Sequence, residues 1–149
     1  MPGIGRGISP YFKLNSINEA GVRAIGGLLT VSGGFKRHTF NYNSAFTDSF
    51  TVIANDASKP VRTFKYGGGA SGGAGGGTSG GGGAGGDAEE LDETLAVGSY
   101  TATIGRGGQV TGFQGNSGGD TVFNGRTMKG GSYGNGNTVP PTGGSGRLG

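Results

Sequence analysis

Side chains suited to catalysis are few in this sequence, and their spacing does not arrange them for it. His38 is the only histidine, and no motif supplies the carboxylate and nucleophile that a His-dependent triad needs. Within FKRHTF, a stretch with strand character, His38 is expected to make a hydrogen bond or to be exposed. The chain has no cysteine, so thiolate metal sites and disulfides are excluded. We therefore expect no catalytic residue and no enzymatic activity.

Four clustered acids are the best candidates for a metal site, namely Glu89, Glu90, Asp92 and Glu93. Their spacing differs from that of an EF-hand loop, which needs Asp or Asn at alternate positions and a closing Glu. A solvated acidic turn over Asp87–Glu93 is the simpler interpretation. The many G-x-G matches follow from composition and lack the strand-to-helix context of a phosphate-binding loop. The sequence thus predicts no metal and no cofactor.

Glycine must position everything else, because 39 of the 149 residues are Gly. The longest tract, Gly67–Gly86, holds fourteen Gly in twenty residues, and its other residues occupy all three phases of a three-residue period, which excludes a collagen repeat. A flexible linker is the default interpretation of such a tract. If it is ordered, it must be extended, polyproline-II-like backbone with hydrogen bonds running sideways between segments, since Gly has no Cβ to hold them apart. We expect the ordered form.

Composition and charge narrow the class of protein further. Leu, Ile, Val and Phe total 28 residues, which is a small supply for a core, and no apolar run has the length of a membrane span. The N-terminus lacks the apolar region of a secretory signal, so we expect no Sec-type export and no membrane insertion. Residues 1–66 carry eight basic and three acidic side chains, whereas residues 87–149 carry four and six. This polarity either steers head-to-tail contacts between subunits or leaves a solvated face on each side.

The N-terminal region, residues 1–27, reads as an arm followed by a short helix. Ser16 and Glu19 have the spacing of a capping box, and Gly26 is placed to end the helix. The arm, Met1–Asn15, either docks on a larger assembly or folds back on its own domain. Its candidate docking residues are Arg6, Ile8, Tyr11, Phe12 and Leu14, which include the aromatic type that dominates interfaces.

Residues 28–131 have the pattern of an all-β domain, and residues 132–149 that of an extended Gly, Asn and Pro tail. Strand-forming runs are bounded by Gly, Asn, Asp, Ser or Pro. Asn124-Gly125 predicts a two-residue hairpin turn between the last two runs. We expect a small antiparallel β-sandwich with ordered Gly-rich extended segments. The runs are LLTV, FKRHTFNY, DSFTVIAN, VRTFKY, residues 100–104, Asp120–Phe123 and Arg126–Lys129.

The order of motifs resembles the glycine-rich domain of bacteriophage tail-fibre and minor tail proteins. The resemblance covers roughly residues 28–131. Two features differ from the family: its third strand is usually apolar whereas VRTFKY is basic, and the acidic Asp87–Glu93 stretch is additional. The pieces that carry the resemblance are GGFKRHTF at 33–40, SFTV at 49–52, RTFKYGGGASGGAGGG at 62–77, YTATIGRGG at 100–108, GNSGGDTVFNG at 115–125 and TMKGG at 127–131.

The resemblance implies a structural virion protein, a tail-fibre or minor tail component that contributes to host attachment, assembled in the host cytoplasm. It implies a homo-oligomer, with a trimer favoured, other virion proteins as partners, and a saccharide or protein of the host surface as receptor. Tyr133, Asn135 and Asn137 are the candidate receptor-facing residues, because Tyr and Asn on adaptable backbone suit recognition. The nearest alternative is a capsid decoration or head-fibre protein.

Two other classes fit less well. An Arg/Gly-type nucleic-acid binder is suggested by Arg6, Arg106 and Arg147 beside Gly, but repeated RGG, an aromatic RNP motif and a concentrated basic face are missing from the sequence. A cell-wall glycine-rich polymer is opposed by the short chain and the single copy of each segment. We expect no nucleic-acid partner.

Overall fold

The computed structural model describes residues 21–42, 47–56, 59–73, 83–111 and 114–134. Their strands form one five-stranded sheet and two two-stranded ribbons, with every pairing antiparallel, so the expected all-β, sandwich-like fold is confirmed. The described residues include no helix long and apolar enough to cross a membrane. The strands are β1 (Val22–Ile25), β2 (Leu28–Ser32), β3 (Phe35–Thr39), β4 (Thr47–Asn55), β5 (Pro60–Tyr66), β6 (Ala88–Thr94), β7 (Gly98–Thr103), β8 (Thr121–Phe123) and β9 (Arg126–Met128).

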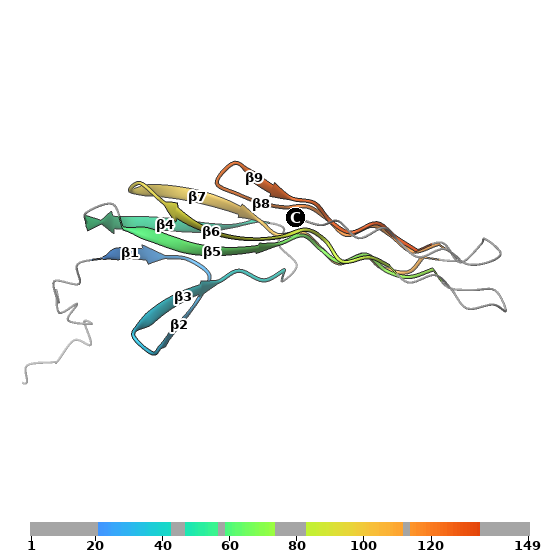
Figure 1. The fold of residues 1–149 in the computed structure, drawn as a ribbon, viewed down its shortest axis with the longest axis horizontal. Helices are drawn as coiled ribbons and strands as arrows, with labels where there is room; N and C mark the ends of the chain where they lie inside the picture. Colours follow the sequence, from blue (N-terminus) through green and yellow to red (C-terminus); the bar gives the residue numbers. More distant parts are fainter. Residues whose placement is uncertain (1–20, 43–46, 57–58, 74–82, 112–113, 135–149) are drawn as a thin grey trace, which may run out of the picture.

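The five-stranded sheet has the order β1-β4-β7-β8-β9, and the β5–β6 ribbon packs on it as a second layer (Figure 1). Alternation along β4 turns Phe50 and Val52 toward the ribbon, where they meet Leu95, the residue just after β6. This apolar core is small, as the supply of large aliphatic residues predicted. Val22, Ala24, Phe40, Val61, Tyr100 and Phe123 border it.

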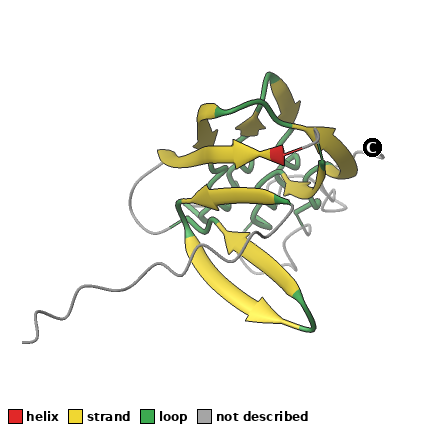
Figure 2. Ribbon diagram, turned by 90° about the vertical axis from the view of Figure 1, so that its left-hand side faces the viewer, coloured by secondary structure: helices red, strands yellow, loops and turns green. Residues whose placement is uncertain are grey.

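Two hairpins have turns that require positive φ. Gly33 and Gly34, with φ of 56° and 80°, join β2 to β3. Asn124 and Gly125, with φ of 49° and 72°, join β8 to β9, which confirms the predicted hairpin turn. The β2–β3 hairpin stands away from the rest of the body (Figures 1 and 2).

The prediction of a short helix ending at Gly26 is wrong for residues 21–26, the part that the structure describes. Val22–Ile25 is strand β1, which pairs with β4 at the edge of the main sheet. Val22 and Ala24 border the core while Arg23 and Ile25 are exposed, which is the period-two pattern of a strand. Tertiary burial of this alternation outweighs the local capping signal, whose residues lie outside the described ranges.

The solvated turn expected over Asp87–Glu93 is also wrong. Ala88–Thr94 is strand β6, which pairs with β5 over seven residues from Tyr66↔Ala88 to Pro60↔Thr94. The acids alternate between the two faces of the ribbon, and the basic residues of β5 face them. Opposite charge across the strands therefore stabilises a strand that propensity alone opposes.

Candidate functional site in the glycine-rich bundle

Five glycine-rich segments run side by side away from the β body and form an elongated bundle (Figure 1). Each one continues a strand, and the chain passes alternately outward and back. The bundle is therefore an extension of both layers of the body rather than a separate domain. The segments are 67–73 after β5, 83–87 before β6, 104–111 after β7, 114–120 before β8 and 129–134 after β9.

Segment 67–71 lies at the centre of the bundle and hydrogen-bonds all four others. Its bonds to a given neighbour recur every three residues, which is the period of a polyproline-II helix; a β-strand would repeat every two. The polyproline-II-like packing expected for the tract is thus what its described part shows. The bonds with segment 83–87 are Gly67 N to Asp87 O (2.9 Å) and Ala70 N to Ala84 O (2.9 Å), and those with segment 114–120 are Gly68 N to Gly119 O (2.9 Å) and Ser71 N to Asn116 O (3.0 Å). Those with segment 129–134 are Gly131 N to Gly68 O (2.9 Å) and Gly134 N to Ser71 O (3.2 Å), and segment 104–111 donates from Gly108 N to Gly69 O (2.8 Å).

Close approach of backbone to backbone explains why the segments are glycine. A Cβ at Gly68 would overlap the carbonyl oxygen of Arg106, and one at Gly118 would overlap that of Gly68. Three positions on the bundle are different: a Cβ would be 3.7 Å from the nearest atom at Gly107, 4.0 Å at Gly69, and without any neighbour within 4 Å at Gly85. The bundle therefore excludes side chains at its interior and tolerates them at a few outer positions.

A hollow of about 270 Å³ lies on the side of the bundle between segments 104–111 and 114–120. Asn116 crosses it: its Nδ2 donates to Gln109 O at 2.6 Å and lies 3.1 Å from Thr111 Oγ1. The guanidinium of Arg106 lies 5.9 Å from the centre of the Tyr42 ring. The lining is polar backbone, amides and one guanidinium, which suits hydroxyl-rich or amide ligands rather than apolar ones. The residues that line the hollow are Arg106, Gly107, Gly108, Gln109, Asn116, Ser117, Gly118 and Gly119.

Of the predicted receptor-facing and docking residues, the structure describes Tyr133. Tyr133 lies on the last bundle segment with 43% of its surface exposed. Asn135 and Asn137 lie outside the described residues. The same is true of the docking candidates Arg6, Ile8, Tyr11, Phe12 and Leu14.

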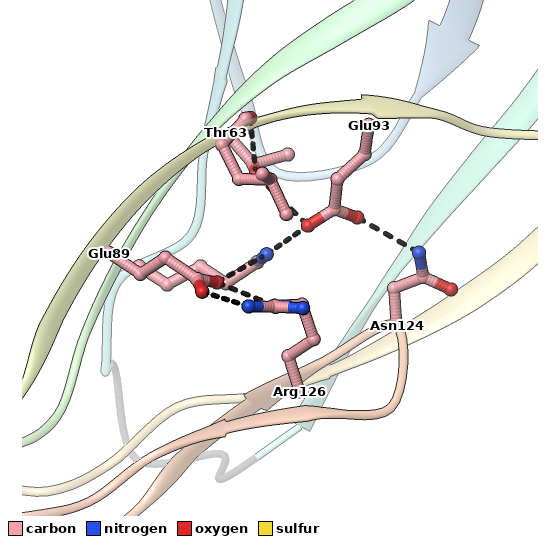
Figure 3. Close-up of polar contacts among 7 residues, drawn as sticks. Thr63, Glu89, Glu93, Asn124 and Arg126 are labelled. Carbon is pink, nitrogen blue, oxygen red and sulfur yellow. Dashed lines mark hydrogen bonds and ion pairs between the residues drawn. The ribbon is translucent and has the colours of Figure 1, made fainter. Parts of the chain in front are cut away.

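At the base of the bundle, an ionic cluster joins the two layers (Figure 3). Lys65 of β5 has only 3% of its side chain exposed and ion-pairs with Glu93 and, at 3.3 Å, with Glu89 of β6. Lys65 Nζ also lies 5.9 Å from the centre of the Phe123 ring. A buried ammonium is thus satisfied by two carboxylates and an aromatic face.

The β8–β9 hairpin completes this cluster from the other layer. Asn124, in the turn, donates from Nδ2 to Glu93 Oε2 at 2.9 Å, and Arg126 grips both carboxylate oxygens of Glu89, with Nε to Oε2 at 2.8 Å. Thr63 Oγ1 lies 3.1 Å from Glu93 Oε1. Strands β5, β6 and β9 are each continuous with a bundle segment, so the cluster lies where body and bundle meet.

The cluster shifts the pKa of its carboxyl groups downward. The hydrogen bond from Arg126 lowers the pKa of Glu89 to about 2, although some desolvation opposes it. Burial raises the pKa of Glu93, but hydrogen bonds from Lys65, Asn124 and Thr63 together bring it below its ordinary value. Both acids stay ionised at neutral pH and pair with cations of this chain.

His38 has a structural role, as the sequence suggested. Its Nδ1 lies 2.8 Å from Gly26 O, and its ring meets Phe50 edge-on with centroids 5.2 Å apart. It connects the base of the β2–β3 hairpin to the core.

Sequence reasoning missed the residues of the ionic cluster. Glu93 was expected in a solvated turn, and Lys65 and Arg126 were placed on predicted strands without a role of their own. A signal was available: a basic strand and an acidic stretch flank the same glycine tract, and complementary strands on either side of a connection tend to pair.

No protein-family model matches the chain, and comparison with curated proteins and with solved structures finds no significant match. The resemblance to the phage glycine-rich domain therefore rests on the motif order alone.

Proposed function

We propose that this protein is a structural component of a bacteriophage virion, a tail-fibre or minor tail protein whose glycine-rich bundle carries recognition segments away from a β body toward the host surface. The observation that carries the proposal is the bundle itself. Five extended segments continue five strands and end well away from the sheets (Figure 1). A rod of this kind serves presentation rather than catalysis.

The rigidity of the bundle supports this function. Ordering glycine backbone costs about 1–2 kcal/mol per residue, and each backbone hydrogen bond returns about 0.5–1.5 kcal/mol. A flexible tether would avoid that cost, so the extensive hydrogen bonding favours a role that needs a fixed direction. The polar hollow and the exposed Tyr133 provide side chains for contact with a saccharide or a protein along the rod.

Locating the protein in intact particles tests the proposal. An antibody raised against the purified chain and labelled for electron microscopy is expected to decorate the tail or its fibres. Decoration of the capsid shell alone would replace the tail assignment with a capsid decoration or head-fibre role. A chain that is never found in particles would contradict the virion assignment altogether.

A further inference from the structure

The β2–β3 hairpin presents exposed apolar and basic side chains on a face that none of the other described residues covers. All five residues of β2 are exposed, and Leu28 and Phe35 have 64% and 78% of their surface exposed. The cross-strand register places them on one face together with Arg37. Phe35 lies at the tip of this face and Leu28 at its base, with Arg37 between them. An isolated two-stranded ribbon is marginally stable in water, so large exposed apolar side chains on it mark a candidate contact site.

The β5–β6 ribbon carries a second uncovered face of complementary character. Its inner face holds the ionic cluster, whereas its outer face exposes Phe64 and Tyr66, at 58% and 64%. Glu90 lies directly across from Phe64. Glu90 and Asp92 share one cation, Arg62, so this face has two carboxylates and one guanidinium and is net negative.

We propose that these two faces bind each other between copies of this chain, the β2–β3 hairpin of one copy lying on the outer face of the β5–β6 ribbon of another. Phe35 would pack against Phe64 and Tyr66, and Arg37, two residues further along the same face, would meet Glu90. The charges support this pairing, since residues 20–47 contain no Asp or Glu while the ribbon face has an excess carboxylate. Aromatic packing with an Arg–carboxylate pair is the composition typical of interface hot spots.

Another copy of the chain fits better than the other occupants of a basic, apolar hairpin. Nucleic-acid binding depends on many phosphate contacts, and this hairpin offers two basic side chains, Lys36 and Arg37. A membrane surface would cover the hairpin but would leave Phe64 and Tyr66 of the net-negative ribbon exposed. Pairing the two faces covers both. The inference concerns association alone and does not depend on where the protein functions.

Sedimentation of the full chain and of paired variants tests the inference. The parent protein at about 100 µM, well above the roughly micromolar Kd of a weak specific complex, is expected to sediment as an oligomer. Phe35→Asp on the hairpin and Phe64→Asp on the ribbon should each weaken association by about a hundredfold or more, as loss of a central aromatic contact does. Equal amounts of the two variants should form a one-to-one complex when mixed, because one intact hairpin can still meet one intact ribbon.

Charge reversal and a matched control sharpen the test. Arg37→Glu and Glu90→Lys should each weaken association, and mixing these two variants should restore it. Val110→Asp, at an exposed apolar residue of the bundle, should sediment like the parent. Melting curves would check that each variant is folded. A monomeric parent would overturn the proposal, and if that monomer bound anionic vesicles through the hairpin, a membrane would be the occupant instead. Variants that associate normally, or folded variants that fail to complement each other, would also overturn it.

Discussion

The β body and the glycine-rich bundle are held together in opposite ways, although the same strands run through both. In the body, side chains fix the layers: Lys65 lies buried between carboxylates of the next strand. Two residues further along, a Cβ on Gly67 would overlap the carbonyl oxygen of Lys129, and most of the bonds that join the segments are backbone hydrogen bonds. The body should therefore be sensitive to removing side-chain atoms, and the bundle to adding them.

Removing the buried cation should have the largest effect on the free energy of unfolding. Lys65→Met leaves Glu93, which has 6% of its side chain exposed, without its ion pair. Losing one partner of a buried pair costs about 3–5 kcal/mol. Urea unfolding monitored by circular dichroism would measure this loss, and Glu89 would keep its bond to Arg126.

A double variant separates the ion pair from simple packing. Lys65→Met with Glu93→Leu removes both charges together, and replacing a buried pair by apolar residues is often neutral or stabilising. The double variant should therefore recover most of the loss. If Lys65→Met were as stable as the parent, the buried ion pair would not be what holds the two layers of the β body together.

Adding one methyl group should have the next largest effect, and only in the bundle interior. Gly118→Ala would place a Cβ on the carbonyl oxygen of Gly68, so segments must move apart at a cost of about 1–3 kcal/mol, as in other overpacked sites. Gly107→Ala is the matched control, because its Cβ would be 3.7 Å from the nearest atom. Hydrogen exchange should show loss of protection at bundle amides in the first variant and little change in the second. Equal behaviour of the two would indicate that the segments are not closely packed.

Sequence alone predicted the parts of the fold that depend on local pattern. The β-branched and aromatic residues of DSFTVIAN, which is bounded by turn-forming residues, and the Asn124-Gly125 dipeptide carry their structure within a few positions. The extended form of the glycine tract followed from the lack of any other way to satisfy its amides. Strands β1 and β6 were missed because their stabilising partners are distant: β1 depends on β4, and the acids of β6 depend on Lys65, Arg62 and the β8–β9 hairpin.

Two departures from the phage-domain pattern explain each other. VRTFKY, which corresponds to the third strand of the family, is basic, and an acidic stretch follows the glycine tract. The structure pairs the two as β5 and β6, with Arg62 opposite Asp92 and Lys65 opposite Glu89. Each looks anomalous alone because its charge lacks a local partner. The neighbours of each bundle segment could not be predicted, since glycine provides no side-chain signal for choosing among them.

Acid should loosen the body before it affects backbone bonding in the bundle. Folded pKa values of Glu89, at about 2, and of Glu93 and Asp92 are below those of the unfolded chain, about 4. The unfolded state therefore binds more protons as pH falls, so stability is full above about pH 5 and is lost progressively toward pH 2. Melting temperature against pH should fall over that window. Glu89→Gln should flatten the slope, and an unchanged slope would show that the cluster does not contribute this linkage.

The smallest effect on unfolding stability is expected from removing the exposed ion pairs of Arg62, on the outer face of the β5–β6 ribbon. Arg62 bonds Asp92 at 2.9 and 3.2 Å and lies 3.5 Å from Glu90, one cation between two carboxylates as at Lys65, but its side chain is 61% exposed. Exposed pairs contribute little to stability and are screened by salt. Arg62→Ala, placed in the Phe35→Asp background so that association does not intervene, should lower unfolding stability only slightly at low salt and by less at high salt. A loss equal to that of Lys65→Met would mean that burial is not what separates the two faces of the ribbon.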